Sequence, residues 1–170
     1  MADVITQIGE AYVGHGAEAA HVNTVLGKKG GPVETAWVTA LATPRSGHAA
    51  FVVVARPGFP AKPATLFVNS VEVQGNEHAR LTWGAAQAGV AAGVLAAVAE
   101  DVIDAGDVDD LLLVAAVWVD PRAADEALVY DNNREATRRA LVAGARRLPH
   151  LDEVLAVAEE PSNPFYRSGG

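Results

Sequence analysis

Cysteine is absent from this chain of 170 residues. A disulfide, a thiolate nucleophile and a cysteine-ligated zinc or iron–sulfur site are therefore excluded. Aromatic residues make up only 6% of the sequence, so a stacking platform for nucleic-acid bases is not expected. Basic residues are also few: 13 lysines and arginines stand against 21 acidic residues, which gives a formal net charge of −8. This balance argues against nucleic acid or an anionic membrane as the main partner.

Half of the residues are hydrophobic, which is enough for one domain with its own core. We predict a single domain over residues 1–158 and a C-terminal tail over 159–170. The first ten residues lack a basic region, so we expect no signal peptide and a cytoplasmic location. Residues 81–99 carry no charge and could nearly span a bilayer, but alanine and glycine dominate them. We interpret this run as a close-packed buried helix and expect no membrane partner.

Hydrophobic periodicity and turn residues predict strands and helices in a mixed order. Alternation on the second strand places His21, Asn23 and Val25 on one face. The order predicts an α+β sandwich, with a mixed sheet and helices packed on one of its faces. The predicted strands are 4–13, 19–26, 49–55, 65–73 and 111–119, and the predicted helices are 32–42, 76–102 and 131–148.

General motifs give little indication of the chemistry. The glycines after the second strand lack the Lys-Ser/Thr of a phosphate-binding loop, and no Gly-x-Ser-x-Gly turn occurs. The five histidines do not have the spacing of metal ligands, so no metal is expected.

One long segment is more specific. Residues 8–22 read Ile-Gly-Glu-Ala-Tyr-Val-Gly-His-Gly-Ala-Glu-Ala-Ala-His-Val, and this resembles the N-terminal signature of the formaldehyde-activating enzymes. The resemblance spans about residues 8 to 142. It continues in order through Gly30-Gly31-Pro32, Gly47-His48, Arg56-Pro57, Lys62-Pro63, Thr65-Leu66, Gly84-x-Ala86-Gln87, Val90-Ala91, Asp109-Asp110-Leu111, Val117-Trp118-Val119-Asp120-Pro121 and Glu135-Ala136-Thr137.

The resemblance implies a fold like the second domain of ribosomal protein S5 and assembly as a homopentamer. It also implies an activity in one-carbon metabolism and formaldehyde detoxification. Formaldehyde would condense with tetrahydromethanopterin, a co-substrate bound between neighbouring subunits, to give the methylene adduct and water. No metal takes part in the family's reaction.

His21 stands at the position of the family's proton donor. The reaction passes through a carbinolamine whose hydroxyl leaves more easily as water, and histidine is suited to donate that proton near neutral pH. The resemblance therefore implies that His21 is the general acid. It assigns the binding of the co-substrate to Asn23, Val52, Ser70, Glu72 and Gln87.

Several of these positions depart from the family pattern. Asn23 replaces an aspartate, so the negative charge two residues after the histidine is lost. Ser70 and Glu72 stand where lysine and threonine are usual, and Val52 replaces a leucine, whereas Gln87 is retained. Further along, Asp120-Pro121 replaces His-Pro, and Asn132-Asn133-Arg134 replaces Tyr-Asn-Tyr.

These departures leave two alternatives open beside the family reaction. The chain could be a related lyase that acts on another reduced pterin or amine, and Glu72 together with the charge of −8 would suit a more cationic ligand. It could also bind or sense an adduct of formaldehyde without catalysing its formation.

Overall fold

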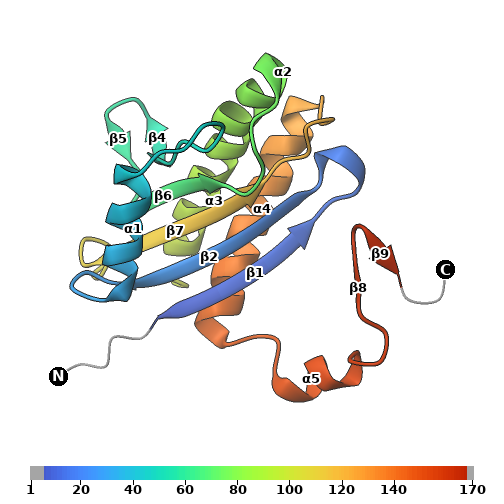
Figure 1. Cartoon of the computed structure of the whole chain (residues 1–170). Coiled ribbons are helices and arrows are strands. Elements are labelled where there is room, and N and C mark those ends of the chain that lie inside the picture. The colour runs from blue at the N-terminus through green and yellow to red at the C-terminus, as the bar shows by residue number, and fades with distance from the viewer. Residues whose placement is uncertain (1–5, 168–170) are drawn as a thin grey trace.

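A five-stranded mixed sheet forms the centre of the molecule (Figure 1), seen in a computed structural model that describes residues 6–167. The strands lie in the order β1-β2-β7-β6-β3. All neighbours pair antiparallel except β6 and β7, which are parallel and are connected through a long helical segment. The sheet strands are β1 (Gln7–Val13), β2 (Ala20–Lys28), β3 (Phe51–Val52), β6 (Ala64–Asn69) and β7 (Leu111–Trp118), and a small hairpin is formed by β4 (Val54–Arg56) and β5 (Phe59–Pro60).

Helices α3 (Gln87–Ala99) and α4 (Glu126–Arg146) cover one face of the sheet. The core lies between this face and the two helices, and Phe67, Leu113 and Val117 are fully buried in it. Glycine allows the layers to approach closely. A Cβ atom on Gly9 of β1 would lie only 1.8 Å from the carbonyl oxygen of Ala140 on α4.

Helix α1 (Pro32–Ala42) departs from the predicted one-sided arrangement, because it packs against the opposite face of the sheet. Gly27 of β2 belongs to that face, and Val33 of α1 lies where a side chain of residue 27 would be. The missing side chain makes room for the helix. The structure is thus α+β with a mixed sheet, but the expectation of helices on one face holds only for α3 and α4.

The uncharged run lies within a helical segment of three parts: α2 (Gly75–Arg80), a π-helical turn η2 (Leu81–Ala86), and α3. The helix ends at Ala99, three residues before the predicted end. Residues 75–99 are long and apolar enough to cross a membrane, and 56% of their most apolar window is buried inside the structure. The segment packs against α4, as expected of a core helix.

Two other predicted boundaries are wrong. The strand predicted over 65–73 ends at Asn69, because the side-chain amide of Asn69 donates to the carbonyls of Gly47 and Val71 and supports a bend there. The last long helix begins at Glu126, five residues before the predicted start at residue 131. The carboxylate of Asp125 accepts a hydrogen bond from the backbone N–H of Leu128 and thereby caps the helix there.

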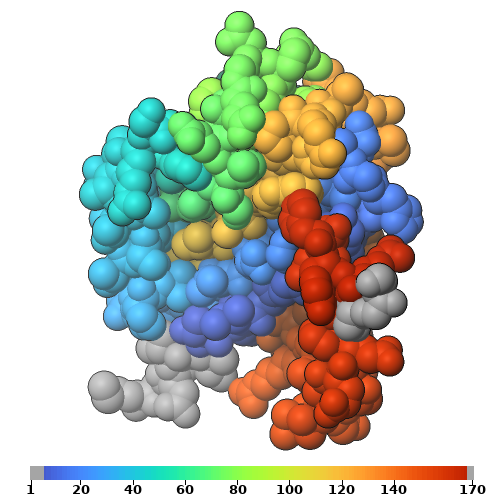
Figure 2. All heavy atoms as spheres, turned by 45° about the vertical axis from the view of Figure 1, so that its right-hand side comes forward, coloured from blue at the N-terminus to red at the C-terminus, as the bar shows by residue number. Residues whose placement is uncertain are grey.

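The C-terminal segment contains a short helix α5 (Leu151–Ala156), followed by a small hairpin of β8 (Ser162–Asn163) and β9 (Tyr166–Arg167). In Figure 2 this segment, coloured red, lies against the part of the surface formed by β1 and β2. The predicted tail therefore has structure up to residue 167, and the hairpin lies beside the face that carries His21.

Candidate active site

His21 lies on the face of the sheet that faces away from α3 and α4. Along β2, Ala20, Val22 and Thr24 are buried toward the core, whereas His21 and Asn23 are only partly buried. This alternation confirms the predicted placement of His21 and Asn23 on one face.

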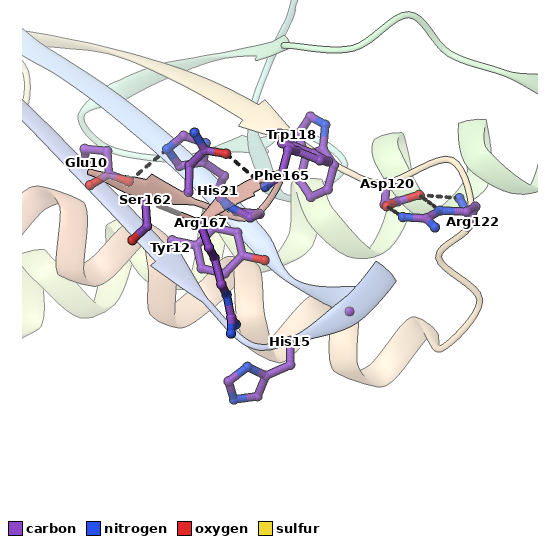
Figure 3. Close-up of a pocket in the computed structure, with 13 residues that line it drawn as sticks. Glu10, Tyr12, His15, His21, Trp118, Asp120, Arg122, Ser162, Phe165 and Arg167 are labelled. Atoms are coloured by element: carbon purple, nitrogen blue, oxygen red, sulfur yellow. Dashed lines mark hydrogen bonds and ion pairs between the residues drawn. The ribbon is translucent and has the colours of Figure 1, made fainter. Parts of the chain in front are cut away.

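The imidazole of His21 is surrounded by side chains of both neighbouring strands (Figure 3). Its Nε2 atom lies 2.8 Å from the Oε1 atom of Glu10 on β1. Tyr12 of β1 and Trp118 of β7 are its direct cross-strand partners. The ring centroids of Tyr12 and His21 are 6.1 Å apart. The imidazole ring thus lies between two aromatic cross-strand neighbours, with a carboxylate at one of its nitrogens.

These residues line an open cavity of about 730 Å³, within the range of small-molecule sites. An adjoining cavity of about 420 Å³ is lined by His21, Asn23 and Ser70. The C-terminal hairpin forms one wall of both, and the ring of Phe165 packs edge-on against Trp118 with centroids 5.8 Å apart. Although aromatic residues are scarce, three of them gather at this site.

A second carboxylate, Asp120, also lines the larger cavity, but Arg122 holds it. The guanidinium of Arg122 donates to both oxygens of Asp120, at 3.0 and 2.7 Å, and the backbone N–H of Arg122 donates at 2.8 Å. The side-chain hydrogen bonds of Arg122 lower the pKa of Asp120 below its usual value. Asp120 is therefore a carboxylate near neutral pH and has no proton to donate.

The predicted binding residues divide into two groups. Asn23 and Ser70 share a cavity with His21, and the backbone N–H of Ser70 donates to Val117 beside Trp118. The other three residues, Val52, Glu72 and Gln87, do not line either cavity of His21. A single copy of the chain therefore brings His21 together with only two of the five predicted binding residues.

Each residue of the separate group has its own place in the fold. Val52 pairs with Leu66 at the sheet edge, and the exposed Glu72 packs beside Gly47. Gln87 at the start of α3 accepts a hydrogen bond of 2.8 Å from the backbone N–H of Val54. In this structure Gln87 thus supports the segment that follows β3.

Of the other histidines, His15 lines the larger cavity together with His21, whereas His78 lies elsewhere. His78 is buried: its Nδ1 accepts from the backbone N–H of Gln74, and its Nε2 lies 2.9 Å from the carbonyl of Val119. Within residues 6–167, no three side chains of histidine, cysteine, aspartate or glutamate gather as metal ligands would.

Sequence reasoning missed Glu10, Tyr12, Trp118 and Phe165 as site residues. Alternation along β1 would have placed Glu10 and Tyr12 on one face, but only the pairing of β1 with β2 brings them to His21. Phe165 carries no local signal, because its contact with Trp118 joins residues far apart in the chain.

Comparison with known proteins agrees with the resemblance seen in the sequence. Residues 8–166 match the family model described as "Formaldehyde-activating enzyme (Fae)". The chain is 38% identical to a protein of Methanosarcina barkeri named 5,6,7,8-tetrahydromethanopterin hydro-lyase, over 94% of this chain and 90% of that relative.

Longer proteins also match. The chain is 39% identical to the "Bifunctional enzyme Fae/Hps" of Methanosphaera stadtmanae over 97% of its own length, but it spans only 40% of that protein. A protein of the same name from Methanosarcina mazei is 40% identical over 88% of this chain, which corresponds to 38% of that relative.

Proposed function

The chain belongs to the formaldehyde-activating enzyme family, and from this membership we propose that it condenses formaldehyde with tetrahydromethanopterin, with His21 as the general acid. The observation that carries the proposal is the match, over nearly the full length of both chains, to a relative named as a tetrahydromethanopterin hydro-lyase. The place of His21 in an open cavity of suitable size supports it.

The chemistry defines what His21 would do. An amine of the pterin adds to the carbonyl carbon of formaldehyde and gives a carbinolamine. Protonated His21 gives its proton to the carbinolamine hydroxyl, the C–O bond breaks, and water leaves while the nitrogen lone pair forms an iminium. The second amine attacks the iminium carbon, and neutral His21 takes up the proton that this amine releases. His21 is thus protonated again at the end of the reaction. General acid catalysis of this kind contributes about 10²- to 10⁴-fold to a rate.

The aromatic residues around His21 suit a flat substrate. Tyr12, Trp118 and Phe165 offer ring faces and edges against which a pterin could pack. Holding both amines and the one-carbon unit together would also make the ring closure intramolecular, which favours the second step.

The separate position of Val52, Glu72 and Gln87 supports a site shared between copies of the chain. In a homopentamer with the S5 domain 2-like fold, the co-substrate would lie between neighbouring subunits, and these residues of one copy would approach His21 of the next. Light scattering should report a mass about five times that of the 17.6 kDa chain. A mass near that of one chain would contradict this assembly. We also propose that the enzyme is located in the cytoplasm.

The co-substrate is tested by comparing two reduced pterins. Purified protein should accelerate the consumption of formaldehyde by tetrahydromethanopterin above the spontaneous rate, and should do so less with tetrahydrofolate. Acceleration with neither pterin would overturn the proposed reaction. Tight calorimetric binding without acceleration would instead support the binding or sensing alternative.

A lyase acting on another amine is the remaining alternative, and Asn23, Ser70 and Asp120 are the departures that line a cavity of His21. Glu72 lies outside that cavity within one chain, so its charge would act on a ligand only across a subunit contact. The substitutions Ser70→Lys and Glu72→Lys together should change pterin affinity or rate. An unchanged affinity and rate would exclude an altered ligand that depends on these two residues.

A further inference from the structure

Glu10 is the carboxylate in contact with His21. The register of β1 and β2 places it directly opposite Asn23 and diagonal to His21 on the same face of the sheet. Its Oε1 atom lies 2.8 Å from Nε2 of His21, which is the distance of a charge-assisted hydrogen bond. Two adjacent strands of the central sheet hold both residues, so the pair is fixed by the register.

The other carboxylates near His21 have different partners. Asp120 is held by Arg122, and the carboxylate of Glu18 accepts from the backbone N–H groups of Ala124 and Asp125. Among the described residues, His21 is the only polar partner of the Glu10 side chain. Glu10 is therefore available to act on His21 alone.

A histidine exchanges protons at the nitrogen that is not already held. The hydrogen bond made by one ring nitrogen decides which tautomer is present and which nitrogen faces the substrate. In hydrolases with a catalytic triad, a carboxylate at one nitrogen orients the ring in this way without itself taking up a proton.

We propose that Glu10 is a positioning residue that holds the Nε2–H group of His21, so that His21 exchanges its catalytic proton with the substrate at Nδ1. The proposal rests on the proposed role of His21 as the general acid. The proton given to the carbinolamine hydroxyl leaves from Nδ1, and the proton released by the second amine returns to Nδ1. The proton on Nε2 stays shared with Glu10 in both states.

The arrangement also bears on Asn23, which lies directly opposite Glu10. Residues directly opposite each other on antiparallel strands lie close together, and like charges at such positions destabilise the pair. With a neutral amide at position 23, Glu10 has no negative charge opposite it. The loss of the aspartate therefore leaves a carboxylate beside His21, supplied from the neighbouring strand.

The first test observes the hydrogen bond itself. In protein labelled with ¹⁵N-histidine, the resonance of His21 is the one that disappears in His21→Ala. Its Nε2–H proton should be protected from exchange with water in the wild type, exposed to rapid exchange in Glu10→Ala, and protected again in Glu10→Gln, which keeps an acceptor oxygen. Glu160→Ala, an exposed glutamate of the C-terminal segment, is the matched control and should behave as the wild type.

The second test is kinetic. Glu10→Ala should lower kcat at least about tenfold, as removal of an orienting partner does, while the KM for formaldehyde changes little. Glu10→Gln should restore most of kcat. Glu10 is 59% exposed, so neither substitution removes core packing.

The two tests separate this inference from the proposed function. Unchanged protection of Nε2–H in Glu10→Ala, or an unchanged kcat, overturns the role of Glu10 even if His21→Ala is inactive. Full activity of His21→Ala overturns the general-acid assignment on which the inference rests, whatever the resonance of Nε2–H shows.

Discussion

Glu135 on α4 is a residue whose ionisation is tied to the folded state. Its carboxylate accepts hydrogen bonds from Arg138, at 3.0 and 2.9 Å, and from Arg139, at 2.6 Å. The side-chain hydrogen bonds of Arg138, opposed in part by burial, lower the pKa of Glu135 to about 2. Two arginines of this helix, Arg138 and Arg139, are thus paired with Glu135.

This pairing predicts a dependence of stability on pH. Because the pKa of Glu135 in the folded state is depressed, its contribution is present above the ordinary value of 4.5 and is lost as the pH falls toward 2. Between these values, urea unfolding of Glu135→Gln should show a weaker loss of stability with falling pH than the wild type. Glu159→Gln, in the exposed C-terminal segment, should follow the wild-type curve. Identical curves for wild type and Glu135→Gln would contradict the assignment.

At this scale the sequence predicts part of the candidate site. Strand alternation correctly places His21 and Asn23 together, because the period of two needs only local information. The contact of Glu10 with His21 depends on strand register, and that of Phe165 with Trp118 on how the C-terminal segment returns. Neither follows from local pattern.

Among the elements, the contact of α3 with α4 depends on two glycines one turn apart. A Cβ atom on Gly89 would lie 2.5 Å from the carbonyl oxygen of Tyr130, and one on Gly93 would lie 2.5 Å from that of Arg134. Both obstacles are backbone atoms of a helix and cannot rotate away. The glycines therefore set the distance between the two helices that cover the sheet.

The substitution Gly93→Ala should separate these helices. We expect it to lower the free energy of unfolding by about 1–3 kcal/mol, the usual cost of overpacking a core, as measured by urea denaturation. Gly84→Ala is the control, because a Cβ there meets nothing within 4 Å, and it should leave stability unchanged or raise it through helix propensity. Equal effects of the two substitutions would show that the close helix contact is not the cause.

The elements themselves were predicted with uneven success for physical reasons. Helix α1 matches its prediction, because Pro32 marks its start and a loop rich in small polar residues follows it. The strand predicted over 49–55 is divided into β3 and β4, with the buried Val53 between them. An apolar run indicates burial, but it does not indicate where the chain changes its pairing partner.

For the whole molecule, family membership and the structure of a single chain answer different questions. The match over residues 8–166 assigns the family, whereas the chain alone presents His21, Asn23 and Ser70 in one place and Val52, Glu72 and Gln87 in others. The family resemblance predicts all five binding residues from the sequence. It does not indicate which of these residues lie near His21 within one copy of the chain. The proposed site between neighbouring copies would account for this separation.

His21 is the residue on which the proposed condensation depends, as its general acid. The most direct test is the initial rate of formaldehyde consumption with tetrahydromethanopterin, corrected for the spontaneous reaction, in His21→Ala and in the control His150→Ala. His150 precedes α5 and does not line the cavities of His21. We predict that His21→Ala lowers the rate by about 10²- to 10⁴-fold while His150→Ala keeps it. A His21→Ala protein that is folded and as fast as the wild type would contradict the account.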